Sequence, residues 1–391
     1  MGAPVTRGCR GCGAPSPDRV LDLGKMPAAD YFPGPDEPAG AAPGREAGHP
    51  LAMDLCRACG LAQLADDDTV TDEPRGIEPR ALRDQAADAL ARVAGAGWLR
   101  GRTVREFGSP HGGSWLPLLA ERGFTATGEP ADVVVDCFGI MHEPDQRAAF
   151  ARRAAALAPD GVLLLQFHAL HAIVAQGQWN ALRHGHFAYY SLAALTRLLA
   201  DAGLRVVTAW EFDLYGGTVL VAAVRDPATA PGPGRPMPGR ALPDHLAPDR
   251  AVTTLLETEA GVLATASGAP DLAAVRTLQT AADAQANALR RWLEHEKAAG
   301  RTVYAYGAAS RAVALLYLAG VSRALLCAVA DASPGKQGRR MPGTDVPIIT
   351  PAELLAARPD RILLTLPDLV QEVRAQWPEL DGRWVVTVPD S

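Results

Sequence analysis

The sequence lacks the features that mark a membrane protein, an exported protein or a nucleic-acid-binding protein. No uninterrupted apolar run approaches the roughly 20 residues that a helix needs to cross a bilayer. The amino terminus, MGAPVTRGCRGCG, has no apolar core of the kind found in signal peptides, so we expect a cytoplasmic protein. Basic residues are in deficit, with 38 Lys and Arg against 44 Asp and Glu, which argues against a nucleic-acid partner. A small phosphorylated molecule remains possible, because a few local cations are enough to bind it.

The composition is otherwise that of a globular protein. Hydrophobic residues make up 48% of the 391 residues and charged residues 21%, so the chain has ample side chains to form cores. A chain disordered throughout would lack this apolar content. At about 150 residues per domain, the length predicts two or three domains. We expect a monomer or a homodimer that acts on a small molecule.

Cysteine is scarce, but its spacing is informative. Four of the six cysteines form two Cys-x-x-Cys pairs, CRGCG and CRACG, each followed by a glycine that suits a tight turn. Two such turns can hold one tetrahedral zinc ion, and four protein ligands leave no open position, so the site would be structural. A redox dithiol or a disulfide is the alternative. The predicted zinc ligands are Cys9, Cys12, Cys56 and Cys59.

Strands alternate with helices after this lobe, which predicts doubly wound α/β sheets. Two strand-like runs at 204–212 and 218–225 flank a Gly-Gly turn and predict an antiparallel pair, as at the end of a class I methyltransferase sheet. A Pro- and Gly-rich stretch then predicts a linker. The predicted architecture is a zinc-binding lobe and two Rossmann-like α/β domains, with the parts at 1–65, 66–226, 227–249 (linker) and 250–391.

The last α/β region predicts a site for a phosphorylated or nucleotide-like group. Gly307 lies between the strand-like VYAY and a helix, where backbone N–H groups can bind an anion. Arg311 follows one turn later, and Lys336 adds positive charge. A routine strand-to-helix turn with a solvated basic loop is the alternative. Cys137 and Cys327 lie in apolar runs and are expected to be buried strand residues.

Several longer motifs carry a resemblance to a known family. They are CRGCG…LDLGKMPAADYF…LCRACGLAQL, HFAYYSLAAL, YGGTVLV and YAYGAASRAVALL…VADASPGKQGRRMPGTDVPIITPAELL. With these motifs in this order, the chain resembles the nucleotide-deoxysugar C-methyltransferases, which methylate a keto-sugar. The resemblance implies S-adenosylmethionine as methyl donor and a base that forms an enolate.

The base of that family resembles His186, in the stretch Arg183-His184-Gly185-His186. A neutral imidazole can act as a base at neutral pH. We expect Arg183 near the developing enolate or a substrate anion, whereas His184 is expected to be structural or exposed. Tyr189 and Tyr190 are candidates for a sugar pocket, although core packing would explain them equally well.

The chain also departs from the family pattern. Arg183 and Gly185 replace the Tyr and Glu of the family's Tyr-His-Glu-His loop. The middle domain is short, because Glu129 runs almost directly into the next strand, where the fold usually has a helix, a strand and a helix. The glycine loop reads EFGSPHGGS and has lost an Asp. The predicted cofactor residues are Glu106, Gly108, Gly112 and Glu129.

Two enzymatic hypotheses and one non-enzymatic hypothesis follow. The first is a methyltransferase that methylates a keto-deoxysugar nucleotide or a related natural-product intermediate at carbon. The second is a homologue that has lost methyl transfer and acts as a cyclase, isomerase or lyase. The third is a binding or partner subunit.

Overall fold

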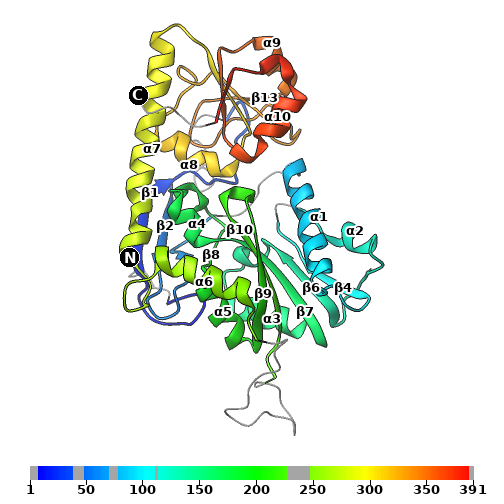
Figure 1. Ribbon diagram of the computed structural model, residues 1–391. Coiled ribbons are helices and arrows are strands. Elements are labelled where there is room, and N and C mark those ends of the chain that lie inside the picture. The colour runs from blue at the N-terminus through cyan, green and yellow to red at the C-terminus, as the bar shows by residue number, and fades with distance from the viewer. Residues whose placement is uncertain (1–7, 38–47, 70–77, 111–112, 228–246, 387–391) are drawn as a thin grey trace.

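The computed structural model describes residues 8–37, 48–69, 78–110, 113–227 and 247–386 (Figure 1). Most of the predicted linker therefore lies outside the described residues. The described strands form three sheets, which agrees with the predicted α/β class. No helix within the described ranges is long and apolar enough to cross a membrane.

The first sheet is antiparallel and belongs mainly to the cysteine-rich lobe. Its order is β1-β2-β3-β8. The last strand comes from much later in the chain, where Ala188 pairs with Gln63 of β3. The segment that carries the predicted base is thereby attached to the amino-terminal lobe. The bounds are β1 Asp18–Met26, β2 His49–Leu55, β3 Ala62–Leu64 and β8 Ala188–Tyr189.

The second sheet has the order β5-β4-β6-β7-β10-β9. Strands β5, β4, β6 and β7 are parallel, and β10 runs antiparallel between β7 and β9, as predicted. Only residues 127–130 separate β5 from β6, so the usual helix, strand and helix are missing and the sheet ends at β5. The bounds are α1 Arg80–Gly95, β4 Thr103–Phe107, α2 Leu116–Ala120, β5 Thr125–Ala126, β6 Ala131–Cys137, α3 Gln146–Ala155, β7 Leu157–His168, α4 Leu170–Ala175, α5 Leu192–Asp201, β9 Leu204–Phe212 and β10 Thr218–Arg225.

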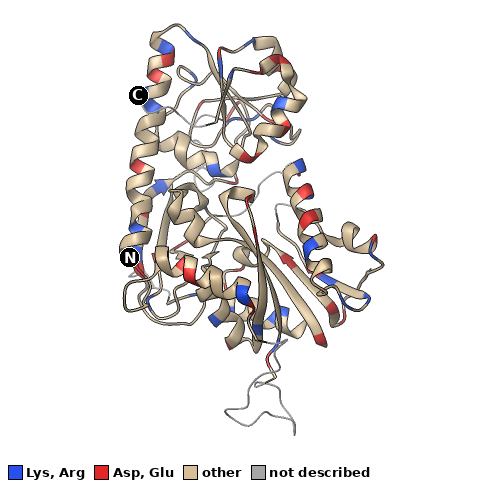
Figure 2. Cartoon of the chain, in the orientation of Figure 1, with Lys and Arg blue, Asp and Glu red and all other residues tan. Residues whose placement is uncertain are grey.

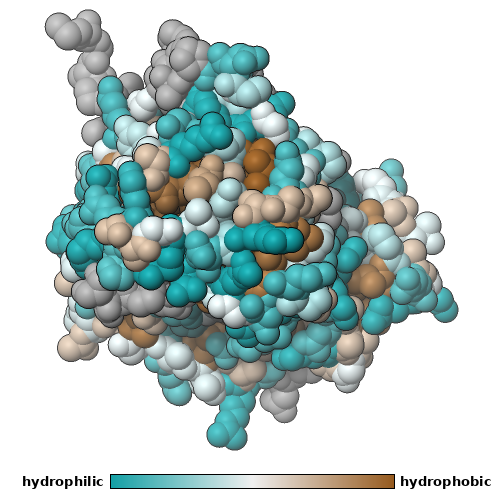
Figure 3. All heavy atoms as spheres, turned by 90° about the horizontal axis from the view of Figure 1, so that it is seen from above, coloured by the Kyte–Doolittle hydropathy of each residue, from teal (hydrophilic) through white to brown (hydrophobic). Residues whose placement is uncertain are grey.

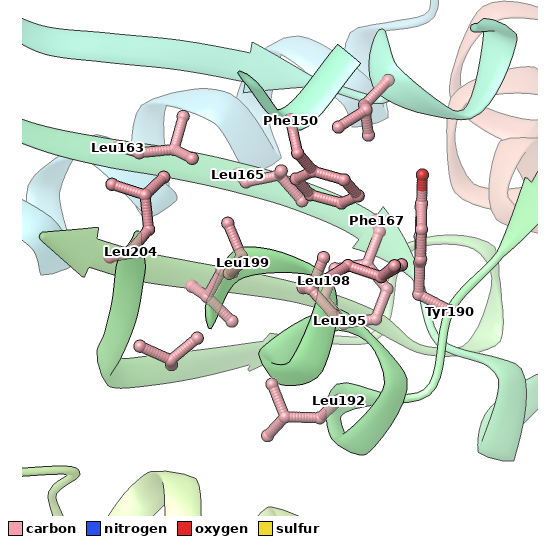
Figure 4. Close-up of a cluster of buried hydrophobic side chains, with 14 of the residues drawn as sticks. Phe150, Leu163, Leu165, Phe167, Tyr190, Leu192, Leu195, Leu198, Leu199 and Leu204 are labelled. Carbon is pink, nitrogen blue, oxygen red and sulfur yellow. The ribbon is translucent and has the colours of Figure 1, made fainter. Parts of the chain in front are cut away.

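One face of this sheet packs on α3 and α5 (Figure 4). The apolar positions of α5 recur at helical spacing and meet the buried side chains of β7. Ser191 caps the start of α5, because its side chain accepts a hydrogen bond from the Ala194 N–H. Tyr190 stands at the rim of the cluster (Figure 4), and its hydroxyl donates to Gln146 Oε1.

Two helices connect the second sheet to the third. The first, α6 (Arg250–Leu263), packs on β9 and α5, and its buried Glu259 accepts hydrogen bonds from the Leu192 and Ala193 N–H groups. The second, α7 (Leu272–Ala298), packs on β1 and extends along one side of the molecule to α8 (Figure 1). The first helix of region 250–391 is thus packed on the middle sheet.

The third sheet is wholly parallel, in the order β13-β12-β11-β14-β15, which is a Rossmann-like arrangement. Cys327 lies just before β12 and is half-buried, so the expectation of a buried strand residue was wrong; β12 is shorter than its apolar run suggests. The bounds are β11 Val303–Tyr306, α8 Ser310–Leu318, β12 Val329–Ala330, β13 Ile348–Ile349, α9 Pro351–Ala357, β14 Arg361–Leu364, α10 Val370–Gln376 and β15 Trp384–Val385.

The described surface is mixed in charge and largely hydrophilic. Both acidic and basic residues occur along α1 and α7 (Figure 2). Seen from the end of the third sheet (Figure 3), hydrophobic residues lie in separate small areas. The large hydrophobic side chains most exposed among the described residues are Tyr317 and Leu318 of α8.

Candidate functional site

The four predicted zinc ligands converge in the amino-terminal lobe. Their sulfur atoms all lie within 4.8 Å of one another, with 3.5 Å from Cys9 to Cys59 and 3.7 Å from Cys12 to Cys56. With zinc–sulfur bonds of about 2.3 Å, a tetrahedral site separates its sulfur atoms by about 3.8 Å. All four cysteines are unbridged, and the glycine after each pair has a positive φ of 76° or 80°. The cluster fits structural zinc.

A cleft of about 450 Å³ lies where the carboxyl ends of strands from the second and third sheets face each other. Ligands of doubly wound folds bind at this edge of the sheet. The cleft contains most of the polar residues that the sequence singled out, together with some that it did not. Its titratable lining residues are Glu78, Cys137, His142, His168, Arg183, His186, Tyr189, Tyr215, Tyr306, Arg311, Asp331, Lys336, Asp368 and Glu372.

The turn from Arg183 to His186, called the histidine turn below, presents the predicted base to this cleft. The His186 N–H donates to the Arg183 carbonyl at 3.3 Å, and Gly185 adopts a φ of 75° that favours glycine. The Arg183 N–H donates to the Tyr189 hydroxyl at 3.2 Å. Tyr189 therefore lines the cleft and also stabilises the turn through its hydroxyl.

The amino-terminal lobe holds the same turn from the other side. Asp67 Oδ2 accepts a hydrogen bond from the Gly185 N–H at 2.7 Å. His184 is buried against the Pro50 carbonyl at 3.2 Å, and burial lowers the pKa of its imidazole. This placement agrees with the structural role expected for His184.

His142 is a site residue that sequence reasoning missed. Its ring centroid lies 4.4 Å from that of His186, with the ring planes at 78°. Its Nδ1 lies 3.0 Å from the Gly185 carbonyl oxygen, which can accept a hydrogen bond from the ring only if Nδ1 carries the proton. The tautomer that fits therefore leaves Nε2 as an acceptor. The signal in the sequence was its position just after a buried strand, at the edge where such sheets bind ligands.

A turn that begins at Gly139 places His142, and a buried ion pair holds that turn. Asp136 Oδ1 accepts from the Gly139 and Ile140 N–H groups at 2.7 and 3.0 Å. Its other oxygen accepts from Arg153 Nε at 2.8 Å, and both side chains are buried. Burial raises the pKa of Asp136, and the Arg153 charge opposes that rise. Cys137, the next residue, ends strand β6 and is a strand residue as expected, but it is half-buried at the cleft instead of fully buried.

His168 and Tyr215 line the cleft between the histidine turn and the third sheet. Burial, together with the charges of Arg311 and Arg183, lowers the pKa of His168 to about 3. His168 is therefore neutral at physiological pH. Tyr215 has a positive φ of 57°, and its N–H donates to Asp368 Oδ1 at 3.0 Å. Neither residue was identified from the sequence.

The two predicted arginines meet across the cleft. An Arg183 Nη1 group donates to the hydroxyl of Ser310, the residue before Arg311. The Arg311 guanidinium carbon lies 5.3 Å from the centroid of the Tyr215 ring. Burial lowers the pKa of Arg311, and the charge of Arg183 lowers it further. Two cations thus share one partly desolvated space.

The predicted cofactor residues are only partly at the cleft. Glu106 holds the loop after β4, because its carboxylate accepts from the Trp115 N–H and the Ser114 hydroxyl, both at 2.6 Å. Space is open beside Gly108, while Gly112 lies outside the described residues. Glu129 is exposed and does not line the cleft, because the shortened connection after β5 turns it outward.

Two of the predicted substrate-binding residues serve the fold instead. Tyr190 is buried against Phe150 and Phe167 and does not line the cleft, so the core-packing alternative holds for it. Lys336 lines the cleft, but its ammonium donates to the Ala308 carbonyl at 2.9 Å and lies 4.5 Å from the Phe32 ring centroid. Gly307 lies in the lining as predicted.

Comparison with known families matches three successive parts of the chain. Residues 9–71 match a model described as a zinc binding domain, and residues 127–209 match a methyltransferase domain. Residues 241–389 match the C-methyltransferase C-terminal domain. In all three parts the chain is similar to the C-methyltransferase family. The predicted resemblance, the methyltransferase class and the predicted cofactors, zinc and S-adenosylmethionine, agree with this result.

A curated relative is similar to this chain over nearly its whole length. The C-methyltransferase NovU from Streptomyces niveus is 26% identical over 437 aligned positions, covering 98% of this chain and 95% of the relative. Solved methyltransferases match only a part of it. Magnesium protoporphyrin IX methyltransferase from Synechocystis is 16% identical, with a TM-score of 0.31 over 39% of this chain and 90% of that one. The mitomycin 7-O-methyltransferase MmcR is 18% identical, with a TM-score of 0.27 over 36% and 53%.

Proposed function

We propose that this C-methyltransferase acts on a carbon next to a ketone, in a keto-deoxysugar nucleotide or a related natural-product intermediate. The observation that carries the proposal is the histidine turn, which presents His186 to a cleft between the two α/β parts. The family match and the relative named as a C-methyltransferase support the reaction class.

His186 is the proposed base. A ketone acidifies the protons on the adjacent carbon, so a neutral imidazole within reach can remove one and leave an enolate. The C–H electron pair passes to the enolate, and the proton passes to the imidazole. His142 lies edge-on at 4.4 Å and restricts the orientation of the His186 ring. Tyr189 and Asp67 fix the backbone of the turn and so fix where the base points.

The loop residues after β4 and β6 fit the adenosylmethionine cofactor. Ser109, Pro110 and Gly113 line the cleft after β4, and Cys137 and Phe138 line it at the end of β6. The space beside Gly108 lets a ligand approach the backbone closely. When bound, the cofactor would supply an electrophilic methyl group for the enolate carbon.

Deuterium exchange tests the base separately from methyl transfer. In heavy water without methyl donor, the wild type should exchange the proton next to the ketone of a keto-deoxysugar nucleotide. His186→Asn should exchange it at least about 100-fold more slowly, which is the lower end for general-base catalysis. The control is His295→Asn, since His295 is exposed on α7. Equal exchange by wild type and His186→Asn would place the base elsewhere.

A second measurement separates the two enzymatic hypotheses. The shortened sheet and the Arg183 and Gly185 replacements favour the alternative of a cyclase, isomerase or lyase that no longer methylates. Calorimetry with S-adenosylhomocysteine should show binding if methyl transfer is retained. Proton exchange without cofactor binding or methyl transfer would favour the alternative.

A further inference from the structure

Two guanidinium groups, those of Arg183 and Arg311, lie in the lining of the cleft. Arg183 comes from the histidine turn and Arg311 from the first turn of α8, and the Arg183–Ser310 hydrogen bond brings them together. Neither forms a salt bridge with a carboxylate in the described part of the chain. Like charges in a partly buried space repel each other, so the arrangement favours a ligand that brings negative charge.

Three carboxylates in the cleft lining accept hydrogen bonds from backbone N–H groups. Asp368 accepts from the Tyr215 N–H at 3.0 Å, and Glu372 accepts from the Arg80 N–H at 3.0 Å. Asp331 accepts from the Ala308 and Ser333 N–H groups, both at 2.7 Å. These carboxylates therefore organise the walls of the cleft, and the two guanidinium groups keep N–H donors for a ligand.

The surroundings of the arginines favour an anion over a neutral group. His168 is neutral at physiological pH, so its imidazole does not change the net charge beside the two arginines. One face of Arg311 lies over the Tyr215 ring, which leaves its planar edge for hydrogen bonds. Two guanidinium groups can each bind a carboxylate or phosphate in a two-point manner.

We propose that the substrate carries an anionic oxygen group, a carboxylate or a phosphate, that binds between Arg183 and Arg311 close to the reacting carbon. The position close to the reacting carbon follows from the turn, because Arg183 and His186 belong to the same four-residue turn. The inference deepens the proposed function and rests on His186 being at the reacting centre.

Binding of simple anions tests the site without any turnover. Calorimetry would use malonate and acetoacetate as carboxylate probes, and pyrophosphate and a nucleoside diphosphate as phosphate probes. We expect the wild type to bind at least one class, with binding weakened by salt. Arg183→Gln and Arg311→Gln should each weaken it at least tenfold, and Arg183→Lys should restore only a part. Arg250→Gln, at an exposed position of α6, is the control with unchanged affinity.

The outcomes are separable from those of the methylation assays. If both variants lose affinity for the carboxylate probes only, the bound group of the substrate is a carboxylate. If both lose affinity for the phosphate probes only, that group is a phosphate. Binding lost in Arg311→Gln but unchanged in Arg183→Gln would overturn the shared site, as would no binding to the wild type. If a variant does not fold, modification of wild-type arginines by phenylglyoxal replaces it. A bound probe should protect both arginines, and failure to protect Arg183 would overturn the proposal.

Discussion

At the scale of single residues, three histidines line the cleft at the proposed reacting centre. His142 and His168 were not evident in the sequence, yet both line the cleft with His186. The arrangement assigns them different tasks, since His142 contacts the base while His168 is buried beside the arginines. These differences lead to two predictions.

His142 is expected to act as a positioning residue through its Nδ1–H and the Gly185 carbonyl. His142→Asn keeps an N–H donor at this position, whereas His142→Phe keeps only the ring. We expect His142→Phe to lower kcat about tenfold with little change in KM, and His142→Asn to retain most of the activity. Steady-state kinetics over a range of pH would check this, because altered orientation of the base should also change the pH profile. Equal activities of the two variants would contradict it.

Protonation of His168 should lower stability in acid. Its folded-state pKa is about 3, whereas an exposed histidine has a pKa of about 6.5. Between these values only the unfolded chain binds the proton, so the free energy of unfolding should fall as pH decreases, by at most about 1.4 kcal/mol per pH unit. Urea unfolding at pH 7 and pH 5 should show a smaller decrease for His168→Gln than for wild type. Identical decreases would argue that His168 is protonated in the folded state.

At the scale of elements, direct contacts join the zinc lobe to the histidine turn. Arg10 lies inside the first Cys-x-x-Cys turn, and its guanidinium carbon lies 4.8 Å from the centroid of Phe187, the neighbour of His186. The Arg10 N–H donates to Gln63 Oε1 at 2.8 Å, and the Leu64 N–H donates to the Phe187 carbonyl at 3.3 Å. The zinc site thus supports the turn through Arg10 and β3.

Loss of zinc should therefore affect both stability and catalysis. Metal analysis should find about one zinc per chain, and Cys12→Ser should lower the thermal midpoint because structural zinc contributes folding free energy. Turnover should fall further than in Arg57→Gln, an exposed control in the second Cys-x-x-Cys turn whose guanidinium contacts Asp18 on the surface. A metal-free lobe that stays folded and fully active would contradict this prediction.

At the scale of the whole molecule, hydrogen bonds across the cleft connect the second and third sheets. Asp368 and Glu372 precede and enter α10, and they accept from the N–H groups of Tyr215 and Arg80. The Arg183–Ser310 bond makes a third connection. The width of the cleft therefore depends on contacts between residues far apart in the sequence.

Removing two of these connections should open the cleft. The double variant Asp368→Ala/Glu372→Ala should raise KM several-fold and increase the radius of gyration measured by small-angle scattering. Each lost hydrogen bond is worth about 1 kcal/mol, so the chain should remain folded. The control is Glu379→Ala, which is exposed near the end of α10 and lies outside the cleft lining. An unchanged radius and KM would show that other contacts set the cleft width.

The sequence by itself determined the elements and the zinc ligands. Strand 131–137, the Ser191 helix cap and the four cysteines were predictable because their signals are local: apolar runs, a capping side chain and a fixed Cys-x-x-Cys spacing. The short connection between β5 and β6 was equally visible, since it depends only on chain length. These features follow from neighbouring residues and need no distant partner.

Only the tertiary structure decided which polar residues share the cleft. His142, His168 and Tyr215 meet His186 because the carboxyl ends of β6 and β7 lie at the same sheet edge, a relation that spans more than local sequence. The same long-range packing buried Tyr190 in the core and left Glu129 exposed. It also placed Arg183 beside Ser310, 127 positions along the chain. Burial and charge balance are properties of the assembled fold, so the two cations facing each other could be recognised only there.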